Sequence, residues 1–260
     1  MRSVTLTPDW VSISIRKQVE PRGCTGATGI DSNLDNITSI DTQNQVDRYD
    51  ISKATRVRAI CRRTRRRFNR NDVRIRKQLF AKYGRIERNR AGWLTHNVSS
   101  NIVLQAKLKK QMIVMEDLNG IRKLYHRGNG QTSGYRSKMN SWSFAELQRQ
   151  IRYKSDWNEI HVIYVRPGGT SAKCSMCGHQ VLPEENRQLH CPNCGLTMDR
   201  DVNAARNILA RGLRFKPVGS ANEAMVAELA QQQAVICKVD ADQLDLRFTK
   251  GADKLTEPLY

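Results

Sequence analysis

The stretch CPNCGLTMDRDVNAARNI, residues 191–208, joins a pair of cysteines to two aspartates and then to a helix-forming run. The first backbone N–H groups of a helix are unpaired, and the helix dipole is positive there, so an aspartate can cap this end. A cap needs only one carboxylate, yet both Asp199 and Asp201 precede the alanines. The second aspartate therefore indicates a further role.

Four cysteines form the most specific local pattern. Their spacing is C-x2-C-x13-C-x2-C, and a glycine follows each pair, at Gly178 and Gly195. Four thiolates at this spacing can surround one zinc ion tetrahedrally, and glycine lets the chain turn sharply beside them. A fully ligated zinc ion leaves no position for water, so we expect it to fold a zinc ribbon without doing chemistry. A redox dithiol needs only one pair of cysteines, so the presence of two pairs favours a metal site. We interpret His179 and His190 as surface residues rather than metal ligands. The expected ligands are Cys174, Cys177, Cys191 and Cys194.

The net charge of +19 is concentrated in one region. Residues 53–90 contain 16 lysines or arginines and only two acids. A solvated helix face usually mixes both signs, whereas a basic stripe is the electrostatic signature of a polyanion partner. Residues 120–141 are expected to form a further basic loop. We therefore predict nucleic-acid contacts, and the residues expected to make them are Arg62, Arg63, Arg65, Arg66, Arg67, Arg74, Arg76, Lys77, Arg122 and Lys123.

Length and composition limit the possible classes of protein. A chain of 260 residues that is 39% hydrophobic can bury one core and a small module. The apolar runs are too short to span a bilayer, and no signal-peptide core is recognisable. The chain has seven cysteines, an odd number, and four of them form two close pairs. This pattern favours metal ligation in a reducing compartment over a disulfide framework. We expect a cytoplasmic protein without a membrane partner.

Periodicity predicts an α/β chain. Alternation predicts a hairpin within residues 4–15 and a strand at 27–31, and helical spacing begins near residue 73 with possible breaks at Gly84 and Gly92. Trp142 is expected to belong to the core rather than to a base-stacking surface. The remaining expected elements are a buried strand in 111–118, a helix at 142–154 and a strand at 159–165.

Acids at the ends of these elements are candidates for catalysis. Asp31 ends one strand, Glu116 and Asp117 end another, and Asp199 and Asp201 open the late helix. Singly, each acid can be a turn or cap residue. Together, three converging carboxylates would suit two magnesium ions in phosphodiester hydrolysis, because hard cations prefer oxygen ligands. Spacing alone leaves both interpretations open, and strand parity does not choose between Glu116 and Asp117 because both faces are apolar upstream.

Four motifs in order resemble the nuclease half of the TnpB family. They are GID at 29–31, VMEDL at 114–118, the cysteine module with TSAKCSMCG and CPNCG, and DRDVNAARNI at 199–208. Members of this family are transposon-encoded, RNA-guided DNA endonucleases related to the type V CRISPR effectors. The resemblance covers roughly residues 27–212, and the four motifs together are highly specific.

The resemblance implies an RNase H-like fold of RuvC type. Such a fold has a mixed sheet with flanking helices and a zinc ribbon inserted before the last catalytic helix. The family's catalytic carboxylates correspond to Asp31, Glu116 and Asp201, which would hold two Mg²⁺ ions about 4 Å apart. Asp199 then remains as the cap. The resemblance also implies DNA and a guide-type RNA as partners, and the sequence identifies no protein partner.

The resemblance also suggests a division into domains, with two departures from the family pattern. Asn33 stands where the family usually has glycine, and few residues precede the first motif, so most of the family's wedge and recognition region is not matched. A nucleic-acid-binding remnant or regulator that does not cut DNA is therefore the alternative function. The expected divisions are a wedge-like remnant at 1–28, the first part of the nuclease domain at 29–168, the ribbon at 169–197, the last catalytic helix at 198–215 and a tail at 216–260.

Overall fold

The computed structural model describes residues 3–8, 11–19, 23–68, 73–140 and 142–214. Strands β1 (Ser3–Leu6) and β2 (Val11–Ser14) form an antiparallel hairpin with Val4 opposite Ile13, which confirms the first prediction. The hairpin belongs to a different compact unit from the sheet and helices that follow it in the chain. The predicted tail at 216–260 lies outside the described residues.

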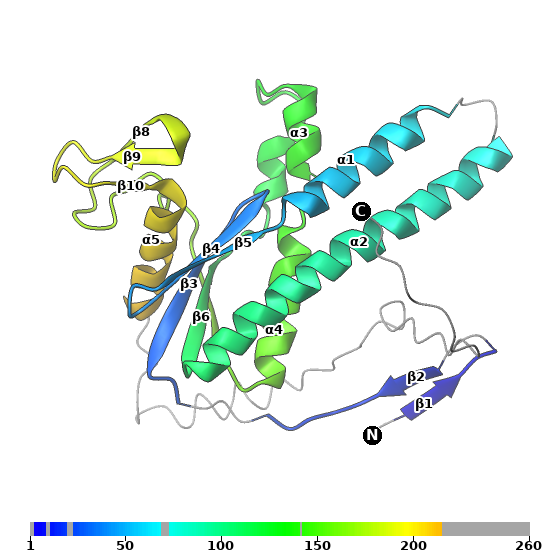
Figure 1. Cartoon of the computed structure of the whole chain (residues 1–260), viewed down its shortest axis with the longest axis horizontal. Coiled ribbons are helices and arrows are strands. Elements are labelled where there is room, and N and C mark those ends of the chain that lie inside the picture. The colour runs from blue at the N-terminus through cyan, green and yellow to red at the C-terminus, as the bar shows by residue number, and fades with distance from the viewer. Residues whose placement is uncertain (1–2, 9–10, 20–22, 69–72, 141, 215–260) are drawn as a thin grey trace, which may run out of the picture. The chain divides into compact units, whose positions relative to one another are not determined.

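A five-stranded mixed sheet is the framework of the part that begins at residue 23 (Figure 1). The strand order is β5-β4-β3-β6-β7; β3, β4 and β5 are antiparallel neighbours, whereas β6 and β7 continue the sheet in parallel with β3. The predicted strands at 27–31, 111–118 and 159–165 are confirmed, and β4 and β5 are additional to them. The bounds are β3 Gly26–Ser32, β4 Asn36–Asp41, β5 Val46–Asp50, β6 Gln111–Glu116 and β7 Val162–Val165.

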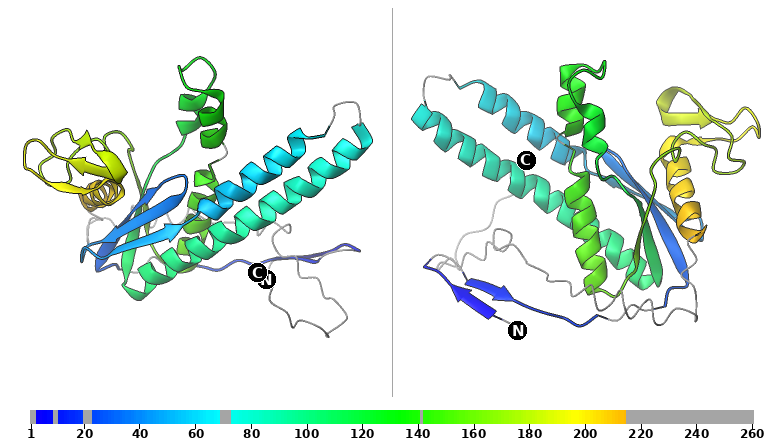
Figure 2. Two further views of the ribbon diagram at one scale, coloured as in Figure 1. Left: turned by 45° about the horizontal axis from the view of Figure 1, so that its top comes forward. Right: turned by 180° about the vertical axis from the view of Figure 1, so that it is seen from behind.

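Helices cover both faces of this sheet (Figure 2). Helices α2 (Val73–Leu108) and α4 (Phe144–Trp157) pack on one face, where Ile30, Ile113 and Met115 are buried against them. Helix α5 (Arg200–Arg214) packs on the other face. It lies so close to β3 that a Cβ atom on Gly29 would sit 2.5 Å from the carbonyl oxygen of Ala205. The predicted mixed sheet with flanking helices is confirmed.

Helices α1 (Ser52–Arg66) and α2 lie side by side as a long helical pair (Figure 1). The predicted breaks at Gly84 and Gly92 are wrong, because α2 runs through both glycines for 36 residues. A glycine costs only about 1 kcal/mol in a helix interior, and packing against α1 and α4 outweighs that cost. No helix in the described part of the chain is both long and apolar enough to cross a membrane.

The segment predicted as a basic loop is partly helical. It contains a short 3-10 helix, η1 (Ile121–Tyr125), and helix α3 (Ser133–Asn140). A small apolar cluster of Leu118, Trp142 and Phe144 holds both ends of this segment on the body of the protein. The burial of Trp142, which is 8% exposed, confirms its expected place in a core.

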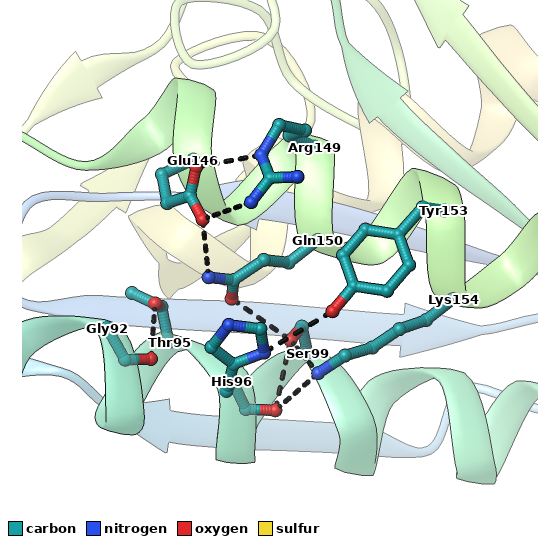
Figure 3. Close-up of polar contacts among 9 residues, drawn as sticks. All are labelled: Gly92, Thr95, His96, Ser99, Glu146, Arg149, Gln150, Tyr153 and Lys154. Carbon is teal, nitrogen blue, oxygen red and sulfur yellow. Dashed lines mark hydrogen bonds and ion pairs between the residues drawn. The ribbon is translucent and has the colours of Figure 1, made fainter. Parts of the chain in front are cut away.

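A polar network joins α2 to α4 (Figure 3). The Lys154 ammonium donates to the His96 carbonyl and the Ser99 hydroxyl, both at 2.7 Å, and to the Ser100 hydroxyl at 2.8 Å. Partial burial lowers the pKa of Lys154 to about 8. Ser99 and Gln150 are fully buried, so this network fixes α2 to α4.

Candidate metal centres and nucleic-acid interface

Strand parity places Asp31 and Glu116 on the face that α5 covers. Gly29 contacts α5 directly, and Asp31 follows it by two residues on the same face. Val114 belongs to the α5-side core, and Glu116 follows it by two. Asp117 is exposed, and its carboxylate accepts a hydrogen bond from the Asn119 N–H at 3.0 Å. The structure therefore separates the two acids that the sequence leaves equivalent.

Helix α5 brings the third acid to this face. The Asp199 carboxylate accepts hydrogen bonds from the Asp201 N–H at 2.9 Å and the Val202 N–H at 3.1 Å. Asp199 therefore caps α5, as predicted, and it also pairs with Arg48 of β5 at 3.1 Å. Asp201, in the first turn of α5, is 3% exposed and lies near Asp31.

The electrostatics show that these three acids share one environment. The pKa of Asp31 is raised to about 7, mainly by burial and then by the charges of Glu116 and Asp201. Burial also raises the pKa of Glu116. The hydroxyl of Thr38, directly across the sheet from Asp31, is buried and has no hydrogen-bond partner among the described residues. Such a crowded, dehydrated group of carboxylates suits a hard cation, whose charge would offset the repulsion.

Arg187 is a functional candidate that sequence reasoning missed. Its Nη2 atom donates to both carboxylate oxygens of Asp201, at 2.6 and 2.7 Å. The residue ends η2 (Glu185–Arg187) in the cysteine module, where Asn186 and Arg187 have left-handed φ angles of 54° and 63°. This unusual backbone turns the arginine toward the acids. No motif marks the position, which lies between the two cysteine pairs.

The asparagines of the opening stretch fix α5 to the chain that enters the cysteine module. Asn203 accepts from the Ser175 N–H at 2.9 Å and donates to the Lys173 carbonyl at 2.8 Å. Asn207 donates to the carbonyl of Thr170 at 2.7 Å, and the Thr170 hydroxyl in turn donates to the Glu116 carboxylate. One helix therefore carries Asp201 and supports Glu116.

The four predicted cysteines come together. Their Sγ atoms lie within 4.8 Å of one another, and they form the only group of three or more potential metal ligands that meets this limit in the described part of the chain. Gly178 and Gly195 have φ angles of +78° and +72°, which confirms why glycine follows each pair. A small sheet supports the cluster, with strands β8 (Leu182–Pro183), β9 (Gln188–His190) and β10 (Thr197–Asp199).

The thiols of this cluster cannot all ionise unaided. The backbone N–H of His179 is the main cause that lowers the pKa of Cys177, to about 6. The Leu196 N–H acts in the same direction on Cys194, but burial and hydrogen bonds with the other three cysteines outweigh it and raise that pKa to about 12. Four sulfur ligands in this arrangement fit a borderline-soft divalent cation such as zinc.

The predicted nucleic-acid residues fall into two groups. Arg62 and Arg65 are half-buried and engaged within the protein: Arg62 donates to the Ser137 carbonyl at 3.2 Å, and Arg65 pairs with Glu87 at 2.6 Å. Arg76 is also half-buried and lies over the Phe80 ring at 5.0 Å. The exposed group, which we call the basic surface, consists of Arg63, Arg66, Arg67, Arg74, Lys77, Arg122 and Lys123.

Comparisons with known proteins agree with this arrangement. A family model described as "Cas12f1-like, TNB domain" matches residues 144–208. The solved Cas12f1–sgRNA–target DNA complex aligns with a TM-score of 0.51 at 23% identity, over 74% of this chain and 51% of that one. This likeness concerns the fold, and it confirms the predicted RNase H-like, RuvC-type class with a four-cysteine insertion.

Two relatives match most of the chain. A Streptomyces pristinaespiralis protein, whose name proposes an RNA-guided DNA endonuclease, is 29% identical over 81% of this chain. The chain spans about half of that relative, 51%. A TnpB-like protein of Methanocaldococcus jannaschii is 32% identical over 216 residues, which are 80% of this chain and 77% of the relative. With that identity over that length, the chain belongs to the TnpB family.

Proposed function

We propose that the chain is a TnpB-type, metal-dependent endodeoxyribonuclease whose catalytic ligands are Asp31, Glu116 and Asp201. The observation that carries this proposal is the meeting of the three acids, from β3, β6 and α5, on one face of the sheet. The pKa of Asp31, raised to about 7 mainly by burial and then by the charges of Glu116 and Asp201, supports the proposal. An endonuclease name on a relative gives independent support.

The donor set fits magnesium better than a softer metal, because all three side chains are carboxylates. Three carboxylates from different elements suit a pair of ions with shared ligands, as in other phosphodiester-cleaving sites. We therefore propose two Mg²⁺ ions.

The protein's own groups have distinct tasks in this mechanism. Bound Mg²⁺ would lower the pKa of the attacking water and stabilise the leaving oxygen. The Thr170 hydroxyl orients Glu116, and the Asp199 cap fixes the turn that presents Asp201. Arg187 offsets the charge of Asp201 by donating to both of its carboxylate oxygens, and its guanidinium would bind the scissile phosphate when Asp201 holds metal. No covalent nucleophile is required.

We also propose DNA and a guide-type RNA as ligands of the basic surface. Its seven exposed cations can neutralise phosphates, whereas the nearby Arg62 and Arg65 are occupied within the protein. The cysteine cluster is proposed to hold one structural zinc ion. The zinc ion would fix the η2 turn and hence the reach of Arg187.

A cleavage assay tests this function. The purified chain is incubated with labelled single-stranded and duplex DNA, with and without Mg²⁺, and any co-purified RNA is sequenced and then supplied in excess. We expect cleavage that requires Mg²⁺ and stops on chelation. Tight nucleic-acid binding without cleavage, under every guide and metal condition, would instead support the non-cleaving nucleic-acid-binding alternative.

A further inference from the structure

Two asparagines at the turn between β3 and β4 reach two different acids: Asn33 lies in the turn, and Asn36 is the first residue of β4. The Asn33 amide donates to the Asp31 carboxylate at 2.7 Å, and the Asn36 amide donates to the Asp201 carboxylate at 2.9 Å. The Asn33 N–H also donates to the Asn36 carbonyl at 2.9 Å, which closes the turn. One short turn therefore directs an amide N–H to each of two proposed metal ligands.

The backbone of this turn is itself fixed by three hydrogen bonds. The carbonyl of Asn33 accepts from the Trp142 indole N–H at 2.9 Å, and that of Leu34 accepts from the Thr55 hydroxyl at 3.2 Å. The carbonyl of Asp35 accepts from the Ile51 N–H at 2.9 Å. These donors precede or belong to α1 and α4, so the turn is anchored to the helical layer while its side chains point to the acids.

The chemistry of the amide suits this position. A carboxylate that ligates a metal must direct a lone pair at the ion, and hydrogen bonds from neighbouring groups set that direction. A neutral amide N–H can orient one carboxylate oxygen without competing as a cation. Arg187, in contrast, places a positive charge on both oxygens of Asp201. The asparagines can therefore keep their hydrogen bonds when metal replaces the arginine.

We infer that Asn33 and Asn36 are positioning residues of the metal centre, which orient the Asp31 and Asp201 carboxylates toward the bound ions. The inference rests on the proposed function. The two asparagines would hold Asp31 of β3 and Asp201 of α5 in the orientation that binds the ions. Neither asparagine is proposed to touch the ions or the DNA.

The test measures metal binding directly in the full, zinc-loaded chain. Mn²⁺ is titrated, and the unbound ion is counted by electron paramagnetic resonance, for the unmutated chain, Asn33→Ala and Asn36→Ala. Asn129→Ala is the matched control, because it removes an exposed amide that donates only to the Leu124 carbonyl among the described residues. Both test variants keep the backbone carbonyls that anchor the turn, so melting temperatures should stay close to that of the control.

Each test variant should bind Mn²⁺ about tenfold more weakly, the usual effect of removing a group that orients a metal ligand. High Mg²⁺ should restore cleavage by these variants, whereas it should not restore cleavage by Asp201→Ala. If Asn33→Ala and Asn36→Ala each fold and each bind Mn²⁺ with unchanged affinity, the inference is overturned, provided that Asp201→Ala still abolishes binding. Unchanged Mn²⁺ binding in Asp201→Ala would instead overturn the metal centre of the proposed function, and the inference with it.

Discussion

The protein contains two clusters of potential metal ligands that are built in opposite ways. The carboxylates come from residues 31, 116 and 201, and the sheet and α5 hold them in place. The cysteines come from residues 174–194, a short segment with few strands of its own. A fold that exists without its cation tolerates the loss of that cation, whereas a small module that closes around a cation does not. The two clusters should therefore respond differently to the loss of metal.

The largest effect is expected at the cysteine cluster. Structural zinc sites contribute roughly 10–16 kcal/mol of apparent binding free energy, so Cys191→Ser should remove the order of residues 169–197. The Arg187 contact with Asp201 should be lost as well. Elemental analysis should find about one zinc ion per unmutated chain, and hydrogen exchange should show the local loss in the variant. Cys24→Ser, outside the cluster, is the control; a folded, reduced chain without zinc would contradict this account.

A smaller and opposite effect is expected at the carboxylates when metal is absent. Asp31 has a pKa of about 7 in the folded chain and near 3.8 when unfolded, so the folded state keeps its proton longer. The free energy of unfolding should therefore fall as pH rises from about 4 to 7 and remain low above that range. Asp31→Asn should lack this fall, so at pH 8 it should be more stable than the unmutated chain, by at most about 4 kcal/mol.

Chemical denaturation across this pH range, without and with Mg²⁺, measures the effect. Mg²⁺ should stabilise the unmutated chain and leave Asp31→Asn almost unchanged, because the variant lacks one ligand charge. Asp117→Asn is the control, since that carboxylate is exposed directly after the strand that carries Glu116. A pH profile of Asp31→Asn identical to that of the unmutated chain would contradict the raised pKa of Asp31.

The exposed and the half-buried arginines should also differ in their effect on nucleic-acid binding. Changing Arg63, Arg66 and Arg67 together to alanine should flatten the salt dependence of nucleic-acid binding, by up to about 0.9 in the log–log slope per lost duplex phosphate contact. Arg65→Ala should leave that slope nearly unchanged and cost at most about 1 kcal/mol of stability, because its partner is Glu87. Binding titrations at several salt concentrations would distinguish them; equal slopes in all variants would refute the assignment of the basic surface.

The smallest effect is expected at the α2–α4 network. The pKa of Lys154 is lowered to about 8, so between about 8 and 10.5 the unfolded chain binds more protons than the folded one. Stability should rise with pH in this range, by less than about 1 kcal/mol, because the ammonium is partly solvated. Lys154→Met should remove the rise, as measured by denaturation at each pH; a rise that persists would assign it to another group.

The cysteine cluster and the cap were predictable because their signals are local. Spacing predicted that the four cysteines come together, and one aspartate before a helix-forming run predicted the Asp199 cap. The choice between Glu116 and Asp117 was not local, since both faces of β6 are apolar and only the packing of α5 distinguishes them. The catalytic roles of the acids and the division into domains stay predictions.

The other features that the sequence did not predict have physical causes of the same kind. Arg187 reaches Asp201 because two non-glycine residues adopt left-handed φ angles, and no spacing rule signals that turn. The unbroken α2 reflects tertiary packing that exceeds the cost of two glycines. The hydrogen bond from Asn36 to Asp201 joins residues 165 positions apart and depends on the closed sheet. Each contact required the assembled fold.

The most direct test of the central claim compares the two aspartates of the opening stretch. Under conditions in which the unmutated chain cuts labelled DNA, Mg²⁺-dependent cleavage is measured for Asp201→Ala and Asp199→Asn at matched melting temperatures. Asp201→Ala should abolish cleavage with the fold intact, whereas Asp199→Asn should keep most activity because asparagine still accepts the hydrogen bonds of the cap. Cleavage that survives Asp201→Ala and is lost in Asp199→Asn would contradict the proposed metal centre.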